Sequence, residues 1–253
     1  MGRKFLQCGV FMAVAISAAV GADRPATATR FSAAQIVERN VAARGGLAAW
    51  RAVGSMSMSG KLEAGGTNNT QLPFVLEMKR PHNTRLELKV NGQTAVQVYD
   101  GANGWKVRPF LNRHEVEPFT PEEQKAAAMQ SELDGPLVDY AAKGSKVELE
   151  GTDKVADREA YKLKLTLKNG EVRRVWVDAE SFLDVKVDGP ARKLDGRYHP
   201  VATYLRDYRS VNGLMVPYVL ETAVEGVKRT EKIKVEKVAV NPVLADSEFS
   251  KPQ

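Results

Sequence analysis

Apolar and polar residues alternate with a period of two over much of this chain, and this alternation constrains the fold more than any other feature. The clearest run extends from Tyr161 to Lys168, where every second residue is tyrosine or leucine and the residues between are lysine or threonine. Successive side chains of a β-strand point to opposite faces of a sheet, so each run predicts a strand with one buried and one solvated face. We count roughly ten or eleven such runs between Ser55 and Val240.

Turn residues separate many of these runs. Three Asn-Gly pairs and one Glu-Gly pair each lie between two strand-like segments, and Asn-Gly readily adopts the positive φ angles of a tight hairpin turn. These pairs are Asn91-Gly92, Asn169-Gly170, Asn212-Gly213 and Glu225-Gly226. In the last strand-like segment, Lys228 to Val240, the pair Glu236-Lys237 interrupts the alternation and predicts a β-bulge. Together these features predict an antiparallel meander.

A helical signal precedes the first strand. Ser32 is a suitable N-cap for a helix that extends to about Arg44 and carries Ile36 on its apolar side. Gly45-Gly46 ends this helix before a second short turn that includes Trp50. The helix is amphipathic, so we expect it to lie on an apolar surface.

A second helical signal lies near the middle of the chain. Thr120-Pro121-Glu122-Glu123 predicts a helix start, because proline suits the first turn and acidic residues favour the positive end of the helix dipole. Residues Lys125 to Tyr140 are apolar enough to continue it as a helix broken around Gly135-Pro136. No alternation of strands and helices indicates a parallel sheet.

These elements predict a mainly β fold, in which a curved antiparallel sheet forms an unclosed half-barrel covered by the N-terminal helix and the helical insertion. An antiparallel sheet with one solvated face must cover the other face. Two helices would leave much of a flat sheet of this size bare, whereas a curled sheet encloses its own apolar face. The space between sheet and helices is therefore the expected functional site.

The first 22 residues have the features of a secretory signal peptide. Arg3 and Lys4 form a basic start, Phe5 to Val20 is mostly apolar, and Val20-Gly21-Ala22 ends in small residues that signal peptidase accepts. We expect residues 1–22 to be removed, residues 23–31 to form a flexible lead-in, and residues 32–253 to form a single domain. The expected location is the periplasm.

Two other interpretations of this leader fit its sequence less well. An uncleaved membrane anchor is possible, but the apolar run is short for a bilayer span and is interrupted by Gln7, Gly9 and Ser17. A lipoprotein leader would place its cysteine after the apolar region, whereas Cys8, the one cysteine of the chain, comes before most of it. The exported protein would have no thiol and hence no disulfide.

Charge does not indicate nucleic-acid binding. The net charge of +6 and the pI near 9.3 are basic, but the lysines and arginines are scattered among 31 acidic residues. No basic helix and no cluster of basic and aromatic residues stands out, so we expect no nucleic-acid partner.

Catalytic signatures are also missing from the sequence. The three histidines, His82, His114 and His199, are not at the spacing of metal ligands, and no Gly-x-Ser-x-Gly motif or phosphate-binding glycine loop occurs. Asp100, Asp178 and Asp207 could form an acid–base pair in three dimensions, but their neighbours are typical of turns and strand ends. We therefore expect no enzyme activity, no cofactor and no metal site.

Large apolar residues remain as the candidates for function. They recur on one face of the predicted strands and could either fill a core or line a lipid-binding pocket, and as a group they favour the pocket. Nine of them are predicted to bind lipid: Met58, Phe74, Leu76, Leu88, Val98, Trp105, Leu163, Leu165 and Trp176.

Three short segments give the chain a resemblance to a known family. Tyr99-Asp100-Gly101-Ala102-Asn103-Gly104-Trp105, followed by Pro109, resembles the Asp-Gly hairpin of periplasmic lipoprotein-sorting proteins related to the LolA and LolB carriers. Lys79-Arg80-Pro81, before the strand that contains Arg85, is similar to their corner between two strands, and Val177 to Leu183 is similar to one of their turns. The resemblance implies an unclosed barrel capped by helices, whose concave apolar face shelters acyl chains in transit across the periplasm.

Three hypotheses follow for function. The first is a non-enzymatic carrier for a lipid or an acylated lipoprotein, in outer-membrane lipoprotein sorting or lipid transport, with inner- and outer-membrane envelope proteins as possible partners. The alternative is a structural or interaction module of the envelope with a filled core and no bound lipid. A hydrolase that uses scattered carboxylates is the third hypothesis. The sequence does not predict an oligomeric state.

Overall fold

The computed structural model describes residues 31–63 and 70–253. The predicted signal peptide and the lead-in up to residue 30 lie outside the described residues. Phe31, which was predicted to belong to the flexible lead-in, instead packs edge-on against the rings of Tyr161 and Phe182. None of the helices in the described residues is long and apolar enough to cross a membrane.

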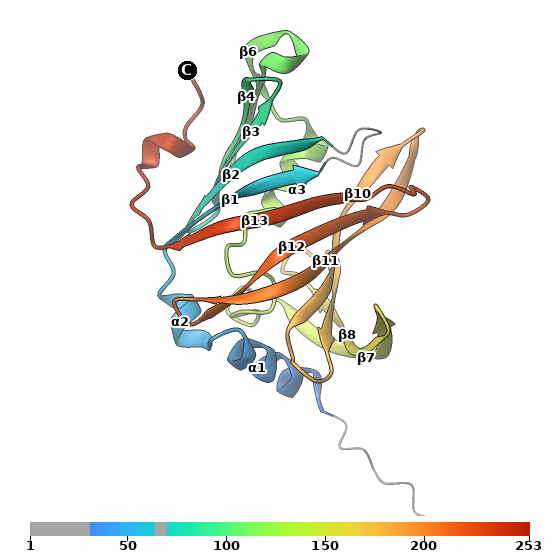
Figure 1. Ribbon diagram of the computed structural model, residues 1–253. Coiled ribbons are helices and arrows are strands. Elements are labelled where there is room, and N and C mark those ends of the chain that lie inside the picture. The colour runs from blue at the N-terminus through green and yellow to red at the C-terminus, as the bar shows by residue number, and fades with distance from the viewer. Residues whose placement is uncertain (1–30, 64–69) are drawn as a thin grey trace, which may run out of the picture. The chain divides into compact units, whose positions relative to one another are not determined.

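The described residues form one antiparallel sheet of 13 strands that does not close into a barrel (Figure 1). The strands are β1 (Ser55–Glu63), β2 (Gln71–Lys79), β3 (Asn83–Val90), β4 (Gln93–Asp100), β5 (Gly104–Arg108), β6 (Arg113–Pro118), β7 (Lys146–Val155), β8 (Arg158–Thr166), β9 (Val172–Asp178), β10 (Asp184–Leu194), β11 (Arg197–Val211), β12 (Leu214–Val224) and β13 (Glu231–Val240). Two meanders, β1 to β6 and β7 to β13, join where β1 pairs with β13. The predicted fold class is confirmed, while the strand count is higher than expected because short, charged strands such as β5 and β6 carry no clear alternation.

The predicted N-terminal helix is confirmed as α1 (Ala33–Ala43), followed by the short α2 (Leu47–Arg51). The Ser32 hydroxyl accepts a hydrogen bond from the Gln35 amide, and the Gln35 side chain accepts one from the Ser32 amide. This reciprocal cap satisfies two amides that have no partner within the helix. It fixes the start of α1 at the residue that the sequence predicted.

The insertion contains one helix, α3 (Pro121–Gln130), which begins at the predicted N-cap Thr120. The prediction that the helix resumes beyond a break, as far as Tyr140, is wrong, because residues 131–144 form turns and bends. Gly135 adopts a φ of 76°, outside the helical region, and Pro136 has no amide hydrogen to continue a helix. Two short 3₁₀ helices, η1 (Pro109–Leu111) and η2 (Asp246–Phe249), complete the elements.

The predicted hairpins and the predicted bulge set the register of the sheet. Asn212 and Gly213 have φ angles of 50° and 82°, as a tight hairpin turn between β11 and β12 requires. Between β1 and β13, Ser59 pairs with Lys237 but Gly60 pairs with Val235, so Glu236 is the extra residue of a β-bulge. A Cβ at position 60 would lie 2.0 Å from the Lys234 carbonyl oxygen, so the close strand approach requires glycine there.

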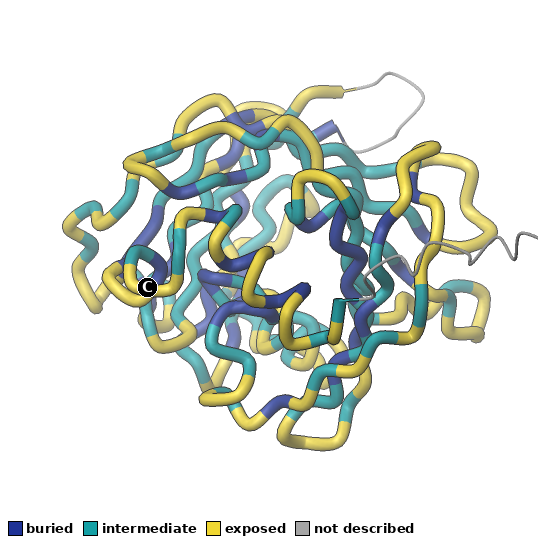
Figure 2. Tube along the Cα trace, turned by 90° about the horizontal axis from the view of Figure 1, so that it is seen from below, coloured by how far each residue is buried: buried dark blue, intermediate teal, exposed yellow. Residues whose placement is uncertain are grey.

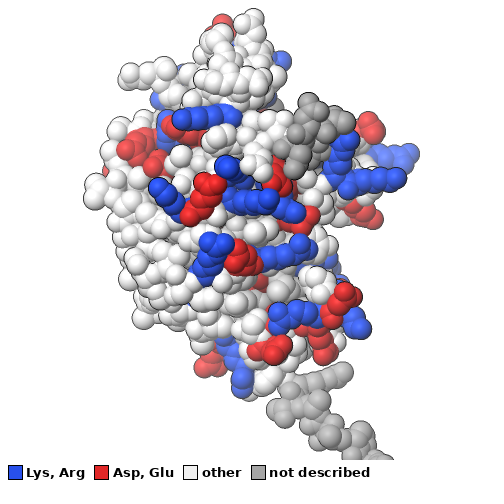
Figure 3. All heavy atoms as spheres, viewed as in Figure 1, with Lys and Arg blue, Asp and Glu red and all other residues white. Residues whose placement is uncertain are grey.

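The two faces of the sheet differ in chemistry. We define the inner face as the one that carries Phe74 and Leu163 and is covered by the helices, and the outer face as the other. Buried residues lie mostly toward the inside of the molecule, and exposed residues lie mostly along the turns at its periphery (Figure 2). On the surface seen in Figure 3, lysines and arginines are interspersed with acidic residues. Arg206 of β11 and Glu221 of β12 form one such ion pair, at 2.9 Å. The outer face is thus largely solvated, as the alternation predicted.

Helix α1 packs on one part of the inner face and completes a filled core. Its residues Ile36, Val37 and Val41 contact a cluster that includes Leu163 and Leu165 of β8. The side chains of this cluster are buried, and those of Ile36, Leu163 and Leu165 are 0% exposed. The part of the sheet beneath α1 is therefore covered by packed side chains.

The C-terminal segment covers part of the outer face. The Lys79 ammonium donates to the Leu244 carbonyl at 2.8 Å, and the Arg85 guanidinium donates to the Glu248 carbonyl at 3.2 Å. Phe249 at the end of η2 is only 2% exposed. This segment buries apolar residues of the outer face near β3 and β4.

Candidate functional site

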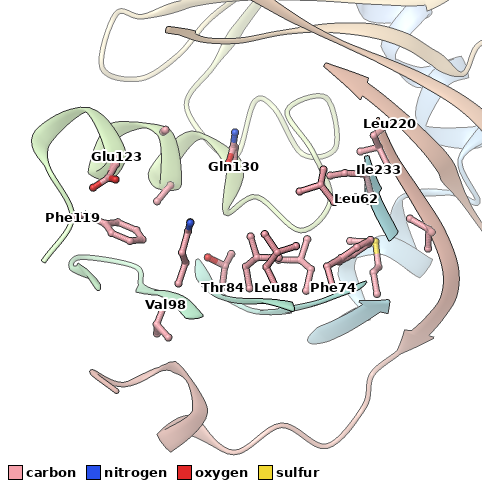
Figure 4. Close-up of a pocket in the computed structure, with 17 residues that line it drawn as sticks. Leu62, Phe74, Thr84, Leu88, Val98, Phe119, Glu123, Gln130, Leu220 and Ile233 are labelled. Atoms are coloured by element: carbon pink, nitrogen blue, oxygen red, sulfur yellow. The ribbon is translucent and has the colours of Figure 1, made fainter. Parts of the chain in front are cut away.

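A cavity of about 310 Å³ lies between α3 and the inner face of β1 to β4, β12 and β13 (Figure 4). Its lining is mostly apolar: Met58, Leu62, Phe74, Leu76, Leu86, Leu88, Val98, Phe119, Ala126, Ala127, Leu220, Ile233 and Val235. Four polar residues complete the lining: Thr84, Gln97, Glu123 and Gln130. Ligand sites in proteins typically combine a predominantly apolar lining with a few polar groups.

Strand register gathers the apolar side chains of the cavity floor. Leu76 of β2 lies opposite Met58 of β1 and Leu86 of β3, and Phe74 lies opposite Leu88. Residues opposite each other in an antiparallel ladder point to the same face, so these five form a continuous apolar patch. Figure 4 shows Phe74 and Leu88 rising from the strands into the space below α3.

Helix α3 covers this patch without filling the space. The helix has no buried residue, and the residues it turns toward the cavity include Ala126 and Ala127. By contrast, α1 inserts Ile36 and Val37 into the core beneath it. Alanine carries a single methyl group, so the volume that longer side chains would occupy stays empty under α3.

Polar contacts hold the N-terminal part of α3. The Lys106 ammonium of β5, itself only 4% exposed, donates to the Glu123 carboxylate, and Lys125 pairs with Glu171 at 2.6 Å. Burial raises the pKa of the Glu123 carboxyl, but hydrogen bonds from Lys106 and the Thr120 amide outweigh it and leave the pKa below its ordinary value. Glu123 is therefore ionised at neutral pH and anchors the helix start to β5.

A buried arginine holds the other end of α3. The guanidinium of Arg173 in β9 donates to the Met129 carbonyl at 3.0 Å, and the residue is 7% exposed. Burial lowers the pKa of Arg173, partly offset by Glu132, Glu171 and Asp188. Helix α3 is thus fastened by polar contacts at both ends and by no buried apolar side chain of its own.

Four of the nine residues predicted to bind lipid direct their side chains toward the cavity: Met58, Phe74, Leu76 and Leu88. Val98 also borders it, but its side chain lies on the outer face, because Val98 pairs with Arg85 while Gln97 pairs with Leu86. Figure 4 shows Val98 pointing away from the cavity. Trp105 pairs with Val98 and shares the outer face.

The other three residues lie elsewhere. Leu163 and Leu165 are on the inner face, but they are 0% exposed and belong to the filled core beneath α1. Trp176 pairs with Lys162 on the outer face, where its indole donates to Asp153 at 3.2 Å and the Lys186 ammonium lies 4.0 Å from the ring centroid. These placements separate the nine residues into three environments.

Several cavity residues were not predicted from the sequence. Leu86 shares the predicted face of Leu88 and could have been found by that alternation. Leu220 and Ile233 come from strands far along the chain and reach the cavity only because β13 pairs with β1. The run Ala126-Ala127-Ala128 in α3 signals a helix that fills little volume.

The carboxylates considered for catalysis are engaged locally. Asp100 accepts hydrogen bonds from the Ala102 and Asn103 amides in its turn. Asp178 accepts from the Ser181 amide and hydroxyl, and Asp207 pairs with Arg209 at 2.7 Å. The described residues contain no group of three histidine, cysteine or acidic side chains placed to hold a metal ion.

Comparisons with known proteins identify the fold through solved structures. No protein-family model matches the chain, and no curated protein matches its sequence. The LolA superfamily protein NE2245 from Nitrosomonas europaea superposes with a TM-score of 0.58 at 13% identity, covering 88% of this chain and 99% of that one. A putative outer membrane lipoprotein-sorting protein domain from Vibrio parahaemolyticus gives 0.56 at 11% identity, with 85% and 95% covered.

A DUF1329 family protein from Desulfovibrio piger gives a TM-score of 0.57 at 13% identity, covering 86% of this chain and 97% of that one. The matched proteins are spanned almost completely, so the similarity extends over the whole fold rather than one motif. The fold implied by the sequence resemblance is thus observed: this chain has the fold of the LolA superfamily proteins.

Proposed function

We propose that this protein is an exported, non-enzymatic carrier that holds acyl chains of a lipid or an acylated lipoprotein in the cavity beneath α3. The observation that carries the proposal is an apolar cavity of about 310 Å³ under a helix that has no buried residue and is held by polar contacts. The likeness in fold to a putative outer membrane lipoprotein-sorting domain supports it. The leader of residues 1–22 supports export, and we place the carrier in the periplasm.

Burial of a chain supplies the driving force. Each CH₂ moved from water into an apolar site contributes about 0.8 kcal/mol, so ten of them contribute about 8 kcal/mol before the costs of association. The floor of the cavity offers Phe74, Leu76 and Leu88 as contacts. A gross stabilisation of about 8 kcal/mol corresponds to a dissociation constant of about 1 μM, and the several kcal/mol of ordering cost weaken the net affinity toward the millimolar range.

Helix α3 is the element that would admit and release the chain. Moving it breaks the contacts of Lys106 with Glu123, Lys125 with Glu171, and Arg173 with Met129. It does not expose a side chain that is now buried on the helix itself. The Lys125–Glu171 pair is largely exposed and contributes little free energy, whereas Lys106 and Arg173 are buried, so these two contacts account for most of the cost of moving the helix.

A pair of alanine variants tests the proposal. Ala127→Phe places a ring in the cavity, whereas Ala128→Phe places the same ring on the exposed side of α3. We expect Ala127→Phe to weaken the binding of a 12-carbon single-chain lipid at least a hundredfold, and Ala128→Phe to bind like the parent, as measured by titration calorimetry on delipidated protein. Circular dichroism on both variants checks that the sheet is intact.

Two results would overturn the proposal. One is a parent protein that binds no lipid, which would favour the envelope interaction module without bound lipid. The other is equal lipid binding by the parent and both variants, which would place the lipid outside the cavity.

A further inference from the structure

The inner face of the sheet is divided into a filled part and a hollow part. Leu163 and Leu165 lie in the filled part beneath α1 and are 0% exposed. Phe74 and Leu88 lie in the hollow part beneath α3. From this division we propose that the cargo inserts a single acyl chain, to a depth of about a dozen carbons, and that the protein does not bury two or three chains together. The inference rests on the proposed carrier function.

The volume of the cavity sets the length of the buried chain. A dry apolar cavity of about 150 Å³ holds one benzene molecule, which has six carbons. On the same scale, the cavity of about 310 Å³ holds about twelve carbons. A cargo with two or three chains of this length would require two or three times that volume.

The shape of the cavity favours a chain over a compact ligand. Its lining extends from Leu220 of β12 across β13, β1, β2 and β3 to Gln97 of β4. Five steps between neighbouring strands of about 4.8 Å each make this row of strands roughly 24 Å long when it is followed along the curved sheet. An extended chain can lie along this row of strands, whereas a compact ligand would contact only part of it.

Neighbouring parts of the fold prevent the cavity from widening to admit a second chain. Toward α1 the next inner-face residues, Met56 and Met78, are already buried in the filled core. Opening a path there would displace close-packed side chains such as Leu165, which costs several kcal/mol per residue. On the other side, the buried Lys106 and its partner Glu123 close the space between β5 and α3.

The lining offers no charged group to a head group. Glu123 is the one ionisable side chain among the described residues that line the cavity, and Lys106 already neutralises it. The polar end of the cargo therefore stays at the mouth, in water, and its charge contributes little to affinity. Chain length alone should control binding.

A chain-length series tests this inference on delipidated protein. The probes are lysophosphatidylcholines with one chain of 8, 10, 12, 14 or 16 carbons, used below their micelle concentrations, with a diacyl phosphatidylcholine and a tripalmitoylated cysteine peptide for comparison. Binding is measured by displacement of a fluorescent acyl probe. Native mass spectrometry of each complex counts the lipids bound.

The affinity should rise about fourfold for each added CH₂ up to about 12 carbons and then level off. The diacyl and triacyl probes should bind no tighter than the 12-carbon probe. In Ala127→Phe the added ring fills about half of the volume, so the affinity should level off near six carbons, while Ala128→Phe should keep the plateau of the parent.

The remaining outcomes distinguish a failure of the single-chain inference from a failure of the carrier function. An affinity that keeps rising through 16 carbons, together with tighter binding of the diacyl or triacyl probe, would overturn the single-chain inference and leave the carrier function standing. Absence of binding for every probe would overturn the carrier function itself. Two single-chain lipids in one complex would also overturn the inference.

Discussion

Two leucines at similar positions in their strands should respond very differently to truncation. Leu165 of β8 is 0% exposed in the filled core, whereas Leu88 of β3 is half-buried and borders the cavity. A buried leucine loses the transfer free energy of its removed atoms and leaves a void, so Leu165→Ala should lower the free energy of unfolding by about 3–5 kcal/mol. Leu88 already lacks packing partners on its cavity side, so Leu88→Ala should lower it by about 1–2 kcal/mol.

The assay is urea unfolding followed by circular dichroism, with the m-value checked to be unchanged. For a domain of this size the two losses correspond to about 10 °C and about 4 °C in Tm. Lipid binding should show the opposite order: Leu88→Ala should weaken the affinity for a 12-carbon lipid about tenfold, and Leu165→Ala should leave it within a factor of two. Equal losses of stability, or weaker lipid binding in Leu165→Ala, would refute the division into a filled and a hollow part.

Three further predictions concern helix α3 and the sheet. Lys106→Met leaves Glu123 without its partner, so lipid should exchange several times faster than in the parent by stopped-flow fluorescence; an unchanged rate would show that this pair does not hold α3. The partners of Glu123 lower the pKa of its carboxyl, so their contacts with the ionised carboxylate stabilise the folded protein. This stabilisation is complete above the ordinary pKa near 4.3 and is lost as pH falls through the lowered pKa. The rate of lipid exchange should therefore be constant from pH 5 to 8 and rise only below about pH 4. A rate that rises between pH 6 and 7 would show that Glu123 does not control the exchange. Gly60→Ala brings a Cβ against the Lys234 carbonyl, so unfolding should cost about 2 kcal/mol less, and an unchanged urea midpoint would disprove the close approach of β1 and β13.

Local sequence signals correctly predicted where two helices begin and where a hairpin turn and a β-bulge occur. Ser32 and Thr120 cap their helices through contacts within three residues, and Asn212-Gly213 forms its turn from its own φ preferences. The bulge at Glu236 interrupts the alternation within its own strand. Each of these features depends on chemistry within a few residues, and a sequence displays such chemistry directly.

The faces of individual strands were less accessible to prediction. Val98 is buried on the outer face because the C-terminal segment with Phe249 covers that face there. This segment lies about 150 residues further along the chain, so the alternation near Val98 does not reveal it. Trp176 lies on the outer face, where it packs against Val155 and Ala160, and this local cluster explains an apolar residue on that face. Alternation shows that two faces differ, but it does not show which distant segment covers each face.

The position of the cavity depends on the difference between two helices. Leu165 and Leu76 occur in similar alternating runs and both point to the inner face. Their environments differ because α1 brings Ile36 and Val37 to one part of the sheet, while α3 brings Ala126 and Ala127 to the other. Only the tertiary arrangement reveals which helix covers which strands.

The most direct test of the carrier function is native mass spectrometry of the protein purified from the exported fraction without detergent, followed by organic extraction. We predict a complex with one bound molecule that carries an acyl chain, which appears in the extract and is replaced by an added 12-carbon lysophospholipid. A protein that shows only its own mass, and gains none after incubation with that lipid, would contradict the central claim.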